Sequence, residues 1–162
     1  MKEIVDDFRE LEGCYVQLLS WCDLLEAIAD FLPCRVDHRL CDTIADGLLL
    51  LLASTHEFEV GVISPCLSLI MTGRELTDTE EHRRTSRLFA RNAAQEVADV
   101  LAALKAGRCS LPWNAVGYLL RSFLVPMRQH IRAEREIVRQ IRKILESLTS
   151  RSVTTEVGTE AV

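Results

Sequence analysis

The distribution of proline and glycine constrains this chain most, because these residues interrupt helices and strands and so mark where elements end. The 162 residues include only four prolines and seven glycines. They fall mostly between long stretches in which apolar residues recur every three to four positions. That period is typical of amphipathic helices, whereas the alternation typical of strands is almost absent. The sequence therefore predicts an all-α fold made of a few long helices.

Four such stretches can be placed from their apolar stripes and end signals. They span roughly residues 5–31, 37–64, 77–106 and 110–148. Asp37 is a good N-cap for the second helix, and Thr77 followed by Glu80 forms a capping box at the third. Pro33 stops the first helix, and Pro126 should kink the last one. Helices of this length with short connections predict an up-down-up-down four-helix bundle.

The length of the chain fits one compact domain, and a hydrophobic content of 48% is enough to form a core. We expect the bundle to occupy residues 1–148. The last stretch, SRSVTTEVGTEAV, has few large apolar groups and no strong period. Residues 149–162 are therefore predicted to form a disordered tail.

Charge and composition exclude several classes of partner. The net charge of −5 argues against nucleic acid, because binding to its backbone requires a basic face. The start, MKEIVDDFRE, lacks the apolar core of a signal peptide, and the longest apolar run, GLLLLLA, is shorter than the roughly 20 residues that cross a bilayer. None of the six cysteines forms a CxxC motif, which favours buried, reduced thiols. We expect a cytoplasmic protein without a nucleic-acid or membrane partner, and with a protein partner or homodimer left open.

His130 and Glu134 stand four residues apart in MRQHIRAEREIV, so their side chains lie one turn apart on the same stripe of the last helix. Helical bundles build metal sites from such pairs together with ligands on facing helices. His56, near the end of the second helix, and His82, near the start of the third, can meet at one end of an antiparallel bundle. The alternative is a solvated charged face, since four arginines lie within residues 128–139.

This pattern resembles the hemerythrin-like family, as a divergent bacterial member. In that family each of two helix pairs supplies a histidine on its first helix, and a histidine followed by a glutamate on its second. His82 in EEHRR and the HxxxE pair of His130 and Glu134 match the second half, and His56 in STHEFEVGV matches part of the first. The resemblance covers roughly residues 10–145.

Two ligand positions depart from the family pattern. Tyr15, or Cys14 with a shift of one residue, stands where the first helix would carry a histidine. Val60 stands four residues after His56, where a carboxylate is expected, and the adjacent Glu59 projects about 100° away from that position. The residues left in ligand positions are His56, His82, His130 and Glu134. The resemblance thus implies a reduced site.

The implied cofactor is iron, with zinc as the alternative, or no metal at all. The implied function is iron-linked sensing or binding at a mononuclear or weak metal site. Reversible oxygen binding at a full di-iron centre is not expected, because too few ligands remain. We assign no catalytic residue, since no acid–base group or phosphate loop stands out, and an enzyme is the less favoured reading. The alternative function is a metal-free regulatory or protein-interaction bundle.

Overall fold

The computed structural model describes residues 2–33 and 36–156, and this part of the chain is all-helical, as predicted. Four long helices dominate it: α1 (Lys2–Phe31), α2 (His38–Phe58), α4 (Gly73–Lys105) and α5 (Trp113–Glu156). Three short segments continue α2: a π-helix, η1 (Glu59–Ile63), then α3 (Ser64–Cys66) and a 3-10 turn, η2 (Leu67–Leu69).

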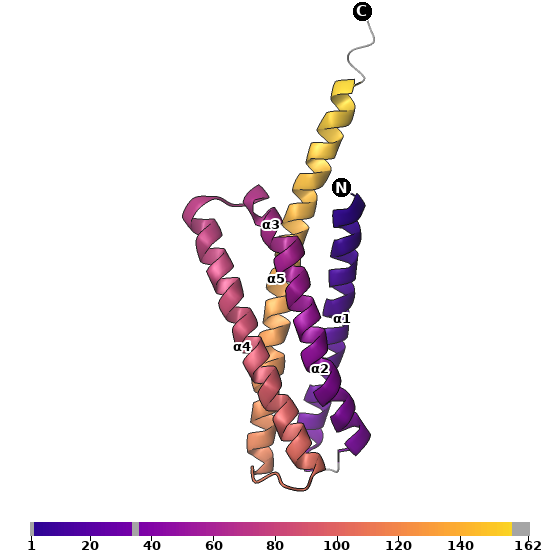
Figure 1. Ribbon diagram of the computed structural model, residues 1–162, viewed down its shortest axis with the longest axis vertical. Coiled ribbons are helices and arrows are strands. Elements are labelled where there is room, and N and C mark those ends of the chain that lie inside the picture. The colour runs from indigo at the N-terminus through magenta and orange to yellow at the C-terminus, as the bar shows by residue number, and fades with distance from the viewer. Residues whose placement is uncertain (1, 34–35, 157–162) are drawn as a thin grey trace, which may run out of the picture.

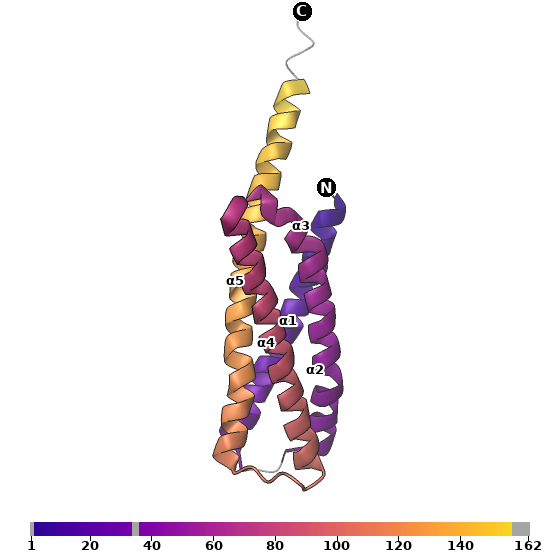
Figure 2. The same ribbon diagram turned by 60° about the vertical axis from the view of Figure 1, so that its left-hand side comes forward.

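The four long helices lie side by side along the long axis of the molecule (Figure 1). The turned view in Figure 2 shows the same lengthwise alignment. Each helix packs against two others: α1 against α2 and α5, and α4 against α2 and α5. The C-terminal part of α5 extends beyond the other helices (Figure 1). The helices therefore enclose one core, and the end of α5 projects from it.

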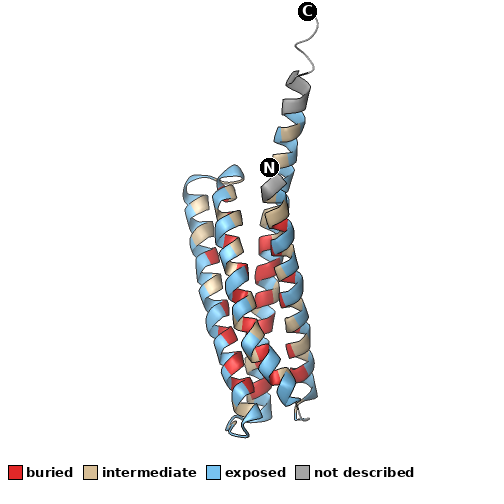
Figure 3. Cartoon of the chain, turned by 45° about the vertical axis from the view of Figure 1, so that its right-hand side comes forward, coloured by how far each residue is buried: buried red, intermediate tan, exposed pale blue. Residues whose placement is uncertain are grey.

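The core follows the apolar stripes of the sequence, and buried residues gather on the inward sides of the helices (Figure 3). On α1 the buried positions recur every three to four residues: Phe8, Leu11, Tyr15, Leu18, Cys22 and Leu25. On α2 and its continuation they are Cys41, Ile44, Leu48, Leu52, Thr55, Glu59, Ile63 and Leu67. The second stripe is apolar except at Thr55 and Glu59, which are buried within it.

The predicted start of a helix is confirmed at one position and wrong at two. The carboxylate of Asp37 accepts hydrogen bonds from the backbone N–H groups of Arg39 and Leu40 at 2.7 and 3.2 Å, so the predicted N-cap of α2 is confirmed. The predicted start at Thr77 is wrong, because α4 begins at Gly73, whose φ of 60° lies in the left-handed region that favours glycine. The last helix begins at Trp113 and not at Ser110.

α5 is longer than predicted. It continues as one helix across Pro126 and ends at Glu156. The segment predicted to be a tail is therefore helical over residues 149–156, and its remainder, residues 157–162, lies outside the described residues.

Within the described residues, one helical stretch, His38–Leu69, has the length and apolar composition to span a membrane. The apolar run GLLLLLA is only part of this stretch, which explains why counting uninterrupted apolar residues misses it. The indication is weak, because the core helix of a globular protein meets the same criterion. Here α2 packs against both α1 and α4.

Candidate metal centre

Three side chains of the kinds that bind metals converge inside the bundle: His56, Glu59 and His130. One ligand atom of each lies within 4.8 Å of the ligand atoms of the other two. Nε2 of His130 is 2.9 Å from Oε1 of Glu59, and the two imidazole rings meet edge to face with centroids 6.2 Å apart. The group therefore offers two imidazoles and one carboxylate at one place.

Glu59 reaches the interior because it lies on the buried stripe of α2. It follows Leu52 and Thr55 and precedes Ile63 at steps of three and four residues, and all four side chains are buried. His56 precedes Glu59 by three residues, a spacing at which side chains are neighbours on a helix surface. Glu59 also begins the π-helix η1, a local widening that is frequent at functional sites.

The sequence signal that could have identified Glu59 as a candidate ligand is its spacing of three residues from His56. The four-residue spacing that joins His130 to Glu134 points instead from His56 to Val60. Val60 is 51% exposed, whereas Glu59 is fully buried. Glu59 does lie about 100° around the helix from Val60, but Glu59 and not Val60 faces the interior and joins the group.

His82 is not brought into the group. It is exposed on α4, where it lines a surface hollow together with Glu75 and Asp78. The next residue, Arg83, lies about 100° further around the helix and takes the interior position, with 3% of its surface exposed.

Glu134 is buried, but both of its carboxylate oxygens are bound to Arg83. The distances are 2.7 Å from Nε to Oε1 and 2.8 Å from Nη2 to Oε2. Such a bidentate pair with a permanent cation satisfies the carboxylate. The group that could hold a metal ion is therefore His56, Glu59 and His130, and the sequence-based candidates include its two histidines but not Glu59.

Arg83 ties several elements together around this pair. Its Nη1 donates to Oγ of Ser64 at 2.9 Å and to Oε1 of Glu80 at 3.3 Å. Its Nη2 also donates to the backbone carbonyl of Glu59 at 3.3 Å. One guanidinium thus connects α4 with η1, α3 and α5.

Two further side chains hold the candidate ligands in place. The hydroxyl of Tyr15 on α1 donates to Oε1 of Glu59 at 3.1 Å. Burial, followed by the charge of Glu59, raises the pKa of Tyr15 far above its ordinary value, so the phenol stays neutral and able to donate. Oγ of Ser86 lies 3.0 Å from Nδ1 of His130. A partner at Nδ1 orients the imidazole and directs Nε2 towards Glu59.

Three buried polar atoms at this place have no hydrogen-bond partner in the described part of the chain: Nε2 of His56, Oε2 of Glu59 and Nη1 of Arg87. Arg87 Nη1 and Glu59 Oε2 are 3.9 Å apart, which is too far for a hydrogen bond. Unpaired buried polar atoms cost free energy, so each calls for a water molecule or an ion. Two of the three are atoms that coordinate metals.

Burial and pairing set the protonation states of the group. Burial lowers the pKa of His56 to about 4, which leaves its imidazole neutral at pH 7, the form that binds metals. Burial alone would lower the pKa of His130, but the hydrogen bond and charge of Glu59 raise it overall. Burial would likewise raise the pKa of Glu59, but the hydrogen bond from His130 lowers it. These opposite shifts favour a proton on His130 and none on Glu59, which is the arrangement of a buried ion pair.

We expect the free energy of unfolding of the metal-free protein to be greatest near pH 6.5, the ordinary pKa of histidine. Below it, the unfolded chain protonates His56 while the folded chain does not, so stability falls towards pH 4. Above it, the folded chain keeps a proton on His130 that the unfolded chain releases, so stability falls as the pH rises through the folded-state pKa. Urea unfolding with a chelator present measures both limbs. His130→Gln should remove the alkaline limb, and a wild-type profile without one would contradict the ion pair.

Compared with known proteins, the chain matches no family model, no curated protein and no solved structure. The hemerythrin-like resemblance therefore stays a prediction drawn from the sequence. A functional conclusion has to come from the geometry of His56, Glu59 and His130.

Proposed function

We propose that this chain is a hemerythrin-like bundle of up-down-up-down connectivity that binds one metal ion and acts in iron-linked sensing or binding in the cytoplasm. The convergence of His56, Glu59 and His130 carries the proposal. Two imidazoles and a carboxylate with open positions are the ligand set of mononuclear non-haem iron, and they also suit zinc.

The residues present fit one such ion. Ligand atoms that bind an ion at about 2.1 Å lie no more than about 4.2 Å from one another. The candidate atoms lie within 4.8 Å, so a small inward movement of the side chains completes the site. Nε2 of His56 and Oε2 of Glu59, both buried without a partner, would gain one. The ion would supply Lewis acidity or, as iron, a redox change, and Tyr15 and Ser86 would orient its ligands.

A second ion does not fit. It would need Glu134, whose two oxygens already pair with Arg83. The guanidinium also places a positive charge beside that carboxylate, which would repel a metal cation. The proposal is thus restricted to a mononuclear site.

A groove between α2 and α4 borders the site, because His56 is among its lining residues. It has a volume of about 730 Å³ and is lined by His56 and Val60 on the α2 side and by Arg91, Asn92 and Gln95 on α4. Nε2 of His56, Glu59 and His130 are buried behind this lining, so small molecules in the groove would reach an ion only after a movement of the His56 side chain.

A metal-free regulatory or interaction bundle is the second candidate, and the buried ion pairs favour it. Arg83 neutralises Glu134, and His130 neutralises Glu59 when its imidazole is protonated. The charges of the interior are then balanced without an ion. Buried polar pairs of this kind persist in some proteins because they specify one packing arrangement.

Metal analysis of untagged protein distinguishes the two candidates. If the proposal holds, reconstitution with Fe(II) under anaerobic conditions, or with Zn(II), gives about one equivalent of bound metal. The melting temperature should rise as well, because a ligand that binds only the folded state stabilises it. Retention of less than about 0.1 equivalent, with no change in melting temperature, would reject the metal site and leave the metal-free bundle.

A further inference from the structure

The outer side of α2 carries apolar surface that the rest of the described chain leaves uncovered. In the apolar 18-residue window of the stretch His38–Leu69, only 28% is buried, whereas a core helix is mostly buried. Leu50 and Val60 are 72% and 51% exposed. On the neighbouring helix α4, Leu88 is 53% exposed. These side chains therefore offer surface that a partner can cover.

The exposed residues on this side of α2 are regularly spaced. Four of them follow one another at steps of three, four and three residues: Leu50, Ala53, Glu57 and Val60. We call these four residues the outer stripe of α2. Such steps keep side chains on one side of a helix, and they are the steps at which one helix contacts another along its length. Ala53 is small, so a second helix can approach closely at the middle of the stripe.

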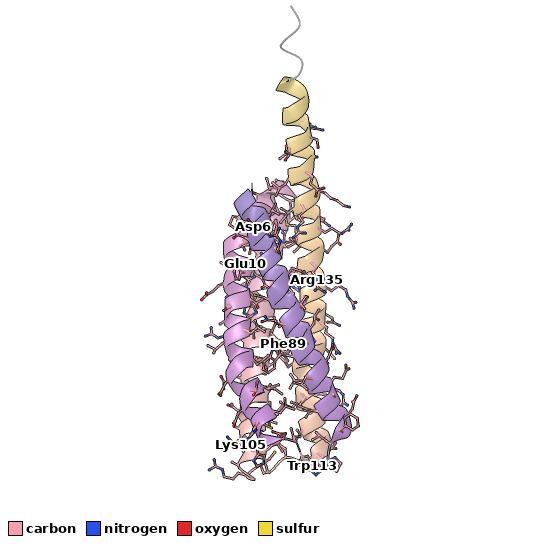
Figure 4. The ribbon with its side chains drawn as sticks, turned by 90° about the vertical axis from the view of Figure 1, so that its right-hand side faces the viewer. Asp6, Glu10, Phe89, Lys105, Trp113 and Arg135 are labelled. Carbon is pink, nitrogen blue, oxygen red and sulfur yellow. The ribbon has the colours of Figure 1, made fainter. Side chains whose placement is uncertain are left out.

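The groove of about 730 Å³ between α2 and α4 runs beside the outer stripe, and Ala53, Glu57 and Val60 are among its lining residues. Its α4 wall carries Arg91, and Leu88 extends this wall because it lies three residues before Arg91. Figure 4 labels Phe89, two residues before Arg91, about midway between Lys105 at one end of the bundle and Asp6 at the other. The groove therefore lies in the middle of the bundle, away from its ends.

The charges of this groove are balanced but not paired. Its lining residues include one carboxylate, Glu57 on α2, and one permanent cation, Arg91 on α4. Both side chains are exposed, and neither forms an ion pair with any residue that the structure describes. A face that carries opposite unpaired charges beside apolar side chains is complementary to itself, as a two-fold interface between identical chains requires. The hydrocarbon of a membrane would leave both charges without a partner.

We propose that two copies of this chain form a dimer in which the outer stripes of α2 pack against each other, antiparallel, across a two-fold axis. With the axis at the level of Thr55, midway between Leu50 and Val60, Leu50 meets Val60 of the partner subunit. Glu57 pairs with Arg91 of the partner subunit. The contact removes the apolar side chains from water and covers the edge of His56 that lines the groove. It does not depend on a bound metal.

Sedimentation equilibrium of the untagged full-length chain, with a chelator present, tests this proposal. We expect a dimer whose fraction falls on dilution. Leu50→Glu places a charge in the apolar contact and should raise the dimer dissociation constant about tenfold or more. Val16→Glu is the matched control, because Val16 is 55% exposed on α1 and does not line the groove, and it should leave the constant unchanged. A wild-type chain that stays monomeric up to about 0.1 mM, or equal loss in Val16→Glu, would overturn the proposal.

Charge exchange tests the contact between Glu57 and Arg91. Glu57→Arg and Arg91→Glu each place like charges opposite one another in the dimer, so each should weaken it roughly tenfold. The double variant restores an opposite pair and should dimerise nearly as well as the wild type, with circular dichroism confirming the fold of every variant. Additive weakening in the double variant would contradict this contact. A monomer that binds phosphatidylglycerol vesicles, and loses that binding in Leu50→Glu, would assign the outer stripe to a membrane and overturn the dimer.

Discussion

Arg83→Met should lower the free energy of unfolding by about 3–5 kcal/mol. The substitution leaves Glu134, which is 1% exposed, as a buried charge without a counter-ion. It also removes the donors that reach Ser64 and the carbonyl of Glu59. Equilibrium unfolding in urea at pH 7 measures the loss. Arg84→Met is the matched control, because Arg84 is the exposed neighbour paired with Glu81 on the same helix, and its loss should leave the free energy of unfolding nearly unchanged.

The double variant Arg83→Met, Glu134→Leu separates charge burial from lost packing. Replacement of a buried ion pair by apolar residues of similar volume is often neutral or stabilising. We therefore expect the double variant to regain most of the stability that Arg83→Met loses. If it is no more stable than the single variant, the uncompensated charge of Glu134 is not the cause of the loss.

The helices were predictable because their apolar stripes are long and regular. Pro33 and Asp37 made the connection between α1 and α2 predictable. Pro33 lacks the backbone N–H that would continue α1, and the side chain of Asp37 caps the start of α2. The start of α4 was misplaced because Thr77 and Glu80 also fit a helix interior. The chain enters that helix one turn earlier, at Gly73, whose φ of 60° is tolerated by few other residues.

The sequence did not identify Arg83 as a buried residue, because the first half of α4 has few apolar residues to show which side of the helix faces the core. A rotation of about 100° decides whether His82 or Arg83 faces inwards. Leu88 and Phe89 suggest the wrong buried side of α4, because both are apolar and yet each is 53% exposed. Ala90, later in the same helix, does mark the buried side. Arg83 lies two turns before Ala90 and therefore on the same side.

The candidate ligands were predictable only in part, for a related reason. His56 and His130 were found because their positions match a known pattern on regular helices. Glu59 was missed because the same pattern demands a four-residue step. Its burial follows from the stripe through Leu52 and Ile63. The apolar period of α2 therefore indicates the inward-facing carboxylate better than the HxxxE spacing does.

Glu59→Gln should abolish stoichiometric metal binding, whereas His82→Ala should leave it unchanged. The amide keeps the shape of the carboxylate but removes the charge that draws a cation to His56 and His130. We expect the affinity to fall by more than the roughly 10–100-fold that accompanies loss of a group supporting a ligand. Chelator competition followed by elemental analysis measures both the affinity and the bound equivalents.

Tyr15→Phe completes this comparison, because it removes only the hydrogen bond to Glu59 and should cost roughly 10–100-fold in affinity. The order Glu59→Gln, then Tyr15→Phe, then His82→Ala is specific to an ion held by His56, Glu59 and His130. If His82→Ala releases the metal as fully as Glu59→Gln does, the ion binds at the HxxxE half-site. Glu134 would then have to exchange Arg83 for the metal, and removal of Arg83 should strengthen metal binding.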